Sequence, residues 1–83
     1  MSECLYVDGG VIKSNPSPYG GTWAWCLVYK DQITESGKGV VLPYKKLPKI
    51  TNNFMELYAA IQGIRAVGRL WRGTIYTDSL ITL

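Results

Sequence analysis

The sequence predicts an α/β fold, in which three antiparallel strands are followed by a crossover helix and a fourth strand parallel to the first. Short runs rich in β-branched and aromatic residues recur before residue 42, with glycine and proline segments between them. A single long segment with helical apolar spacing comes next, and one more strand-like run follows it. Strand–helix–strand connections are right-handed and return the second strand parallel to its partner, which gives a mixed sheet.

The first strand is expected over Glu3–Val7, where strand-forming residues alternate. It is expected to stop at Asp8-Gly9-Gly10, a combination typical of a tight loop with unusual backbone angles. The following segment, residues 13–21, combines prolines with glycines and therefore can continue neither a strand nor a helix.

A second strand is expected over residues 22–29, which are aromatic and aliphatic enough to be buried. Residues 30–32 then form a hairpin turn, and a third strand runs over 33–41. Because glycine has no side chain to pack, Gly37 and Gly39 are expected to weaken this strand or to mark a bulge in it.

The helix is expected to begin near Thr51 or Asn53 and to end near Gly68. Its pattern predicts one broad apolar face, typical of a helix that packs on a sheet, with Glu56 at the margin. The residues of that predicted face are Phe54, Leu57, Ala60, Ile61, Ile64 and Val67. The fourth strand is expected over Gly73–Thr77 and ends at Asp78-Ser79, either of which could cap a new helix.

Length and composition indicate one small domain, residues 1–83, with 47% hydrophobic and 18% charged residues. No apolar run reaches the length of a membrane span, and no signal peptide is recognisable, so we expect a cytoplasmic protein with no membrane partner. Cys4 and Cys26 fall within predicted strands and are expected to be free thiols.

The net charge of +3 is unevenly distributed along the chain. Basic residues gather just before the helix and in its second half, namely Lys45, Lys46, Lys49, Arg65, Arg69 and Arg72. Such clusters could serve a phosphate backbone, whereas charge alone favours a solvated surface.

Three carboxylates stand out because the predicted topology brings them together. Asp8 and Asp78 follow the first and fourth strands, and Glu56 lies one turn into the crossover helix. Each has a structural interpretation when taken alone: a turn residue at Asp8, a capping box that pairs Glu56 with Asn53, and a helix cap at Asp78. Their convergence favours a divalent cation site for Mg²⁺ or Mn²⁺, since close carboxylates repel one another unless cations join them.

The motifs LYVDGG with NPSPYGG, TNNFMELYAAIQGI and IYTDS occur in this order and resemble the ribonuclease H family, of the type 1 bacterial and phage kind. The resemblance implies a ribonuclease H-like fold and a hydrolase, an endonuclease that cuts the RNA strand of RNA–DNA hybrids with two divalent cations. It implies that Asp8, Glu56 and Asp78 are catalytic and metal-binding, as three of the family's four such carboxylates. Matching substrate-binding positions are Gly9, Asn15, Thr51, Asn52, Asn53 and Ser79.

The chain also departs from the family pattern. The stretch between Asp8 and Asn15 is about one residue longer than the common bacterial pattern, and Leu80 stands where a glutamine is frequent. The family continues with further helices, a fifth strand, a histidine-bearing loop and the fourth carboxylate, whereas this chain has no histidine. We therefore interpret the sequence as the N-terminal half of a ribonuclease H, with impaired activity on its own. Two alternatives are a non-catalytic nucleic-acid-binding module and a half-domain completed by a C-terminal segment, a partner chain or a second copy.

Overall fold

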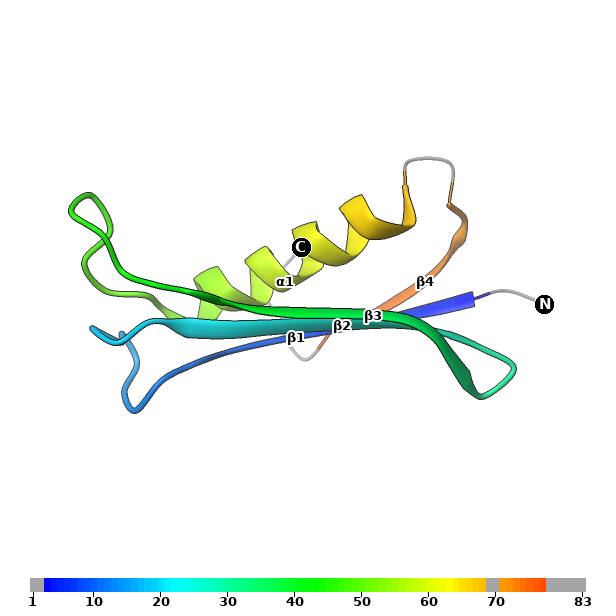
Figure 1. Ribbon diagram of the computed structural model, residues 1–83, viewed down its shortest axis with the longest axis horizontal. Coiled ribbons are helices and arrows are strands. Elements are labelled where there is room, and N and C mark those ends of the chain that lie inside the picture. The colour runs from blue at the N-terminus through cyan, green and yellow to red at the C-terminus, as the bar shows by residue number, and fades with distance from the viewer. Residues whose placement is uncertain (1–2, 69–70, 78–83) are drawn as a thin grey trace.

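A computed structural model describes residues 3–68 and 71–77 of the chain and shows one helix lying across one face of a sheet (Figure 1). The strand order is β3-β2-β1-β4; β1 pairs antiparallel with β2, β2 antiparallel with β3, and β4 parallel with β1. This arrangement confirms the predicted α/β class and topology. The elements are β1 (Glu3–Val11), β2 (Gly21–Tyr29), β3 (Gln32–Val41), α1 (Asn52–Val67) and β4 (Gly73–Thr77).

Strand β1 is longer than predicted. The expected loop at Asp8-Gly9-Gly10 is wrong, because these residues continue the strand and pair in register with Ala24, Trp23 and Thr22 of β2. The interpretation of Asp8 as a turn residue is wrong for the same reason. Two adjacent glycines lower the local strand propensity, and pairing with a complete neighbouring strand overrides that preference.

Gly9 serves the packing of α1 on the sheet. A Cβ atom built at Gly9 would overlap the carbonyl of Met55 and would lie 2.8 Å from the backbone nitrogen of Glu56. Only glycine therefore lets the first turns of the helix approach the backbone of β1 so closely. At Gly10, the nearest atom to such a Cβ is the Thr22 hydroxyl oxygen at 4.0 Å, which leaves room for a methyl group.

The Gly9→Ala variant is therefore expected to lower the free energy of unfolding by at least about 2 kcal/mol, because backbone atoms of α1 would have to move. Gly10→Ala is the matched control and is expected to change the free energy of unfolding by no more than about 0.5 kcal/mol. Urea unfolding followed by circular dichroism measures both. Equal stability of the two variants would contradict the close approach of α1 to Gly9.

The buried face of α1 differs from the predicted one. The structure buries Met55, Glu56, Ala59, Ala60 and Gly63, whereas Leu57, Ile61 and Ile64 of the predicted face are 44–48% exposed. Small residues face the sheet because the helix lies close to it: a Cβ at Gly63 would be 3.0–3.3 Å from side-chain atoms of Val7, Leu5 and Trp25. The apolar pattern marks the helix correctly, but side-chain size decides which part of it can approach the sheet.

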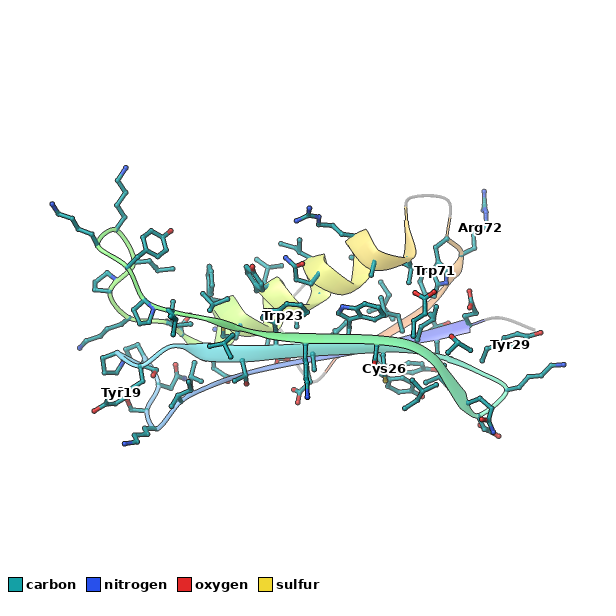
Figure 2. All side chains as sticks on the ribbon, in the orientation of Figure 1. Tyr19, Trp23, Cys26, Tyr29, Trp71 and Arg72 are labelled. Carbon is teal, nitrogen blue, oxygen red and sulfur yellow. The ribbon has the colours of Figure 1, made fainter. Side chains whose placement is uncertain are left out.

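Gly37 and Gly39 make room for two indole rings. A Cβ at Gly37 would lie 2.5–2.9 Å from the ring of Trp25, and one at Gly39 would lie 2.6–2.8 Å from the ring of Trp23. Trp23 lies on the side of the sheet that α1 covers (Figure 2). The prediction of a bulge at these glycines is wrong, because the register shift between β2 and β3 falls at Leu27/Val28. The glycines thus extend the core over β3.

The turn predicted over residues 30–32 is one residue shorter, because Gln32 belongs to β3, and β2 is less buried than expected, since Thr22 and Ala24 are exposed. Lys30 and Asp31 form the hairpin turn, with φ angles of 53° and 63°. Cys4 and Cys26 are free and partly buried. Within residues 3–68 and 71–77, no helix is long and apolar enough to cross a membrane.

Candidate active site

Glu56 lies where α1 crosses the ends of two neighbouring strands. Its side chain is only 4% exposed, although it carries a carboxylate. Oε1 accepts a hydrogen bond from the backbone N–H of Gly9 at 2.7 Å, and Oε2 accepts one from the Thr77 hydroxyl at 3.3 Å. The carboxylate therefore links the C-terminal parts of β1 and β4.

Gly9 lies next to this position on β1. The described pairs of the parallel ladder reach Val7–Thr77, and Gly9 follows two residues after Val7. A partly buried backbone N–H such as that of Gly9 needs an acceptor. Glu56 provides that acceptor from the helix.

This geometry corrects the capping-box interpretation of Glu56. The N-cap of α1 is Thr51, whose Oγ1 accepts a hydrogen bond from the N–H of Phe54 at 3.1 Å. Glu56 thus lies too far along the helix to bond back to the cap, and its carboxylate points to the sheet instead. The buried charge of Glu56 is held by hydrogen bonds from two strands rather than by the helix terminus.

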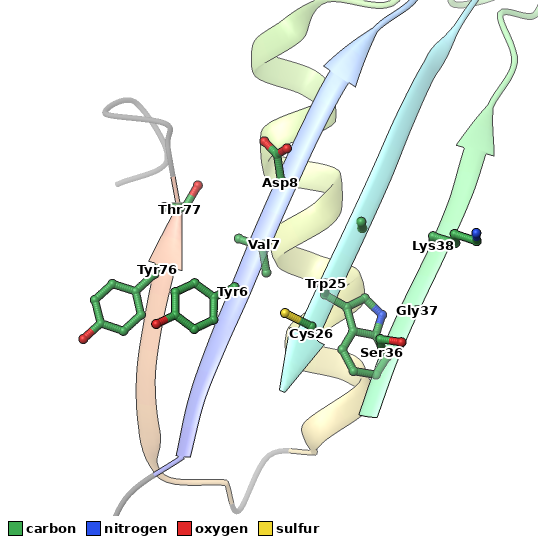
Figure 3. A pocket seen from close by; sticks show the side chains of 11 residues that line it. Tyr6, Val7, Asp8, Trp25, Cys26, Ser36, Gly37, Lys38, Tyr76 and Thr77 are labelled. Carbon is green, nitrogen blue, oxygen red and sulfur yellow. The ribbon is translucent and has the colours of Figure 1, made fainter. Parts of the chain in front are cut away.

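The other two predicted carboxylates are neighbours in sequence of the residues that Glu56 contacts. Asp8 precedes Gly9; it is exposed and lines a shallow hollow on the sheet face opposite α1 (Figure 3). Asp78 follows Thr77 but lies outside the described residues, as does Ser79. The structure thus places the Glu56 carboxylate against Gly9 and Thr77, which are the sequence neighbours of Asp8 and Asp78.

The described residues offer one buried carboxylate, that of Glu56, to a divalent cation. Among them, no group of three or more His, Cys, Asp or Glu side chains is gathered in one place. Each oxygen of Glu56 accepts one hydrogen bond and keeps further lone-pair capacity, and carboxylate oxygen is the ligand that Mg²⁺ prefers. Glu56 could therefore supply part of such an ion's coordination, while the Asp8 side chain lines the sheet face opposite α1.

Several predicted substrate-binding residues lie together where α1 begins. The backbone N–H of Asn52 donates a hydrogen bond to Oδ1 of Asn15 at 3.0 Å, although the two residues are 37 positions apart. Thr51, Asn52 and Asn53 are exposed, as is Asn15. Gly9 differs from this group, since its described role is to admit the helix.

Sequence reasoning missed two supporting residues. Ser17 is fully buried; its hydroxyl donates to the Ile12 carbonyl and accepts from the N–H groups of Tyr19 and Gly20 at 3.1 and 3.2 Å. The loop between β1 and β2, which contains Ser17, is joined to the residues before α1. Ser17 and Ile50 exchange two backbone hydrogen bonds, of 2.7 and 2.8 Å. Thr77 was missed as a partner of Glu56, although its place just before Asp78 at a strand end could have indicated it.

The hollow beside Asp8 is lined by residues of all four strands. Tyr6 and Tyr76 stack there with ring centroids 5.0 Å apart, and Lys38 of β3 lies across the sheet from them (Figure 3). Both tyrosines are more than 40% exposed. This face of the sheet therefore presents aromatic surface next to a predicted metal ligand.

Comparisons with known proteins show which family this chain resembles in sequence. The RNase H family matches residues 1–83. The chain is 39% identical over 79 residues to a protein named Ribonuclease H from Caldicellulosiruptor saccharolyticus, covering 95% of this chain and 48% of that protein. It is 38% identical over 81 residues to Ribonuclease H of Legionella pneumophila, with the same two coverages. Ribonuclease H of Pseudomonas putida is 41% identical over 75 residues, which is 90% of this chain and 44% of the relative.

The chain spans about half the length of these relatives. No solved structure gives a significant match. The family match over the full sequence, the mixed sheet with its crossover helix and the curated relatives lead to one assignment: this chain belongs to the ribonuclease H family.

Proposed function

We propose that this chain supplies part of an endonuclease that hydrolyses the RNA strand of RNA–DNA hybrids with two divalent cations, Mg²⁺ or Mn²⁺. One observation carries the proposal: the buried carboxylate of Glu56 bonds to Gly9 and Thr77, the immediate neighbours of Asp8 and Asp78. A buried carboxylate requires compensation, and a cation shared with the two aspartates would complete it.

In this proposal Asp8, Glu56 and Asp78 hold the cations. When bound, divalent cations activate the attacking water and stabilise the charge on the leaving 3′ oxygen. Gly9 and Thr77 fix the orientation of the Glu56 carboxylate through their hydrogen bonds, so that its free lone pairs keep one direction.

The substrate would lie against the residues at the start of α1. Exposed amides at Asn15, Asn52 and Asn53 can bond to 2′-hydroxyl groups, which distinguish RNA from DNA. The hydrogen bond between Asn52 and Asn15 holds these two segments in a common surface. Ser79 would extend the same surface.

The proposal is tested with a chimera in which residues 1–83 replace the matching part of Ribonuclease H from Legionella pneumophila. The chimera is expected to cleave the labelled RNA strand of a hybrid in Mg²⁺ and not in EDTA. Asp8→Asn and Glu56→Gln should each lower the cleavage rate at least about a hundredfold. Glu56→Gln keeps the shape of the side chain and an oxygen that can accept the hydrogen bond from Gly9. A lower cleavage rate in this variant therefore isolates the role of the negative charge.

The unmodified Legionella protein is the positive control, and circular dichroism establishes that each chimera is folded. A folded chimera that binds hybrid but does not cleave it would contradict the nuclease proposal and favour the non-catalytic binding module. Retention of full activity in Asp8→Asn would remove Asp8 from the proposed metal site.

A further inference from the structure

Residues 43–49, between β3 and α1, form a small protruding loop that we call the basic finger. Tyr44 and Leu47 close its tip with two reciprocal backbone hydrogen bonds of 3.0 and 2.9 Å. Lys45 and Lys46 are the two residues enclosed by this bridge, and both are exposed. The fold of the finger thus presents two adjacent lysines at its tip, and Lys49 is exposed near its base.

Two features make the basic finger stiff. Pro43 and Pro48 flank the tip, and the proline ring fixes the backbone φ angle at both positions. At the base, Ile50 is fully buried and exchanges backbone hydrogen bonds with Ser17. A preformed loop loses little conformational freedom on binding a ligand, which favours affinity.

The basic finger lies at the end of the molecule that carries the proposed substrate surface. The finger is followed by Ile50 and then by Thr51, the N-cap of α1. The loop between β1 and β2 is held beside the start of α1 by the hydrogen bond between Asn52 and Asn15. In Figure 1 the finger projects beyond the start of α1, at the end of the sheet opposite the turn between β2 and β3. The molecule extends 43 Å along this axis.

The charge of the basic finger is not balanced by nearby sequence. No aspartate or glutamate occurs between Glu35 and Glu56, and the lysines of that stretch are Lys38, Lys45, Lys46 and Lys49. Tyr44 of the finger is 60% exposed, and Leu42, just before the finger, is 67% exposed. Unbalanced positive charge on a stiff protrusion suits an extended polyanion with regularly spaced phosphates.

We infer that the basic finger binds the phosphate backbone of the same duplex that occupies the proposed active site, outside the carboxylate centre. The inference rests on the proposed function and adds a second contact to it. Lysine contacts to phosphate carry no sequence or sugar information. The finger therefore contributes affinity and fixes the position of the duplex on the protein, while the asparagines at the start of α1 distinguish RNA from DNA.

The test compares two triple variants of the 83-residue chain. Lys45→Gln/Lys46→Gln/Lys49→Gln neutralises the basic finger. Its matched control removes the same charge from exposed residues elsewhere, by substitution of Lys30, Arg65 and Arg72 with glutamine. Lys30 lies in the turn at the far end of the sheet, and Arg72 lies just before β4 (Figure 2).

Binding of a labelled RNA–DNA hybrid, and of a DNA duplex of the same sequence, is measured by fluorescence anisotropy in EDTA over a series of salt concentrations. Each phosphate contact contributes about 0.9 to the slope of log K against log salt. The finger variant is therefore expected to reduce the magnitude of that slope by about 2 to 3 for both duplexes, whereas the control reduces it by less than about 1.

Equal slopes for the unmodified chain and the finger variant would overturn the inference while leaving the proposed function intact. An equal reduction in the control variant would also overturn it, because it would show a diffuse charge effect. If the unmodified chain binds neither duplex, both the inference and the hybrid-binding part of the proposed function fail. Should the triple variant unfold, the single Lys46→Gln variant is expected to reduce the slope by about 1, and no reduction would overturn the inference.

Discussion

The 83-residue chain alone is expected to cleave an RNA–DNA hybrid at least about a hundredfold more slowly than the Legionella chimera described above. Its relatives are about twice as long as this chain, and the family resemblance implies a fourth metal-binding carboxylate in the part that the chain does not match. In-line displacement with two cations requires both to be held in full coordination. Loss of one ligand weakens the stabilisation of charge at the reacting phosphate.

Single-turnover cleavage of the labelled hybrid, with enzyme in excess, measures this difference without interference from product release. Raising Mg²⁺ should recover part of the rate, because a weakly held ion binds again by mass action. Addition of the remaining part of the Legionella protein as a separate chain is the second arm of the experiment. Rapid, Mg²⁺-dependent cleavage by the chain alone, abolished by Asp78→Asn, would show that the four-strand unit is catalytically sufficient.

The parallel pairing of β4 could be predicted because it follows from a local strand-forming run and a general rule of chain topology. Gly73–Thr77 is a short strand-forming run after a helix, and the handedness of the crossover fixes its parallel pairing with β1. Strand β1 was predicted too short, because glycine propensity describes an isolated segment and not one paired with β2. Pairing between distant segments is the information that local patterns lack.

The helix shows the same limit. The apolar pattern predicted the length of the helix but not its buried face. Leu57 and Ile61 match the helical spacing of apolar residues, yet the structure buries the smaller residues Ala59 and Gly63. Hydrophobicity alone cannot rank these alternatives. The distance between α1 and β1 decides, and Gly9 sets that distance.

For the candidate site, sequence order indicated Glu56, but the contacts of its carboxylate depended on three-dimensional structure. The bond from Gly9 depends on how α1 is placed over β1, which brings Glu56 to a residue 47 positions away, and no local motif encodes that contact. The roles of Asp8 and Asp78 stay predictions that the cleavage experiments test, and the roles of the predicted substrate-binding residues stay predictions.

The chain is also expected to associate in solution through β4. In the described sheet β4 is the last strand in the order and lies beside β1, and its sequence Gly73–Thr77 contains no charged residue. Ile75 and Tyr76 are 40% and 48% exposed, and Tyr76 stacks on Tyr6 at the open face of the sheet. An uncharged edge next to exposed apolar surface favours pairing with another chain.

Strand β3 is the other edge of the described sheet, and it is less suited to pairing. It is longer, with 10 residues, but it carries Glu35 and Lys38. Charged side chains on an edge strand oppose association, because pairing would bring them against a second chain. We therefore expect β4 strands of two copies to pair across a two-fold axis, or β4 to recruit a C-terminal segment like that of the longer relatives.

Light scattering at micromolar concentration is expected to give a mass above that of one chain. Ile75→Lys in β4 should shift the equilibrium toward the monomer, since it places a charge beside the paired edge. Ile33→Lys is the matched control, because Ile33 is 67% exposed on β3 and the substitution is the same. A well-folded monomer for the unmodified chain would contradict the expected association. Dissociation by Ile33→Lys alone would assign the interface to β3. Glu35 and Lys38 would then have to form ion pairs with the second chain across that interface.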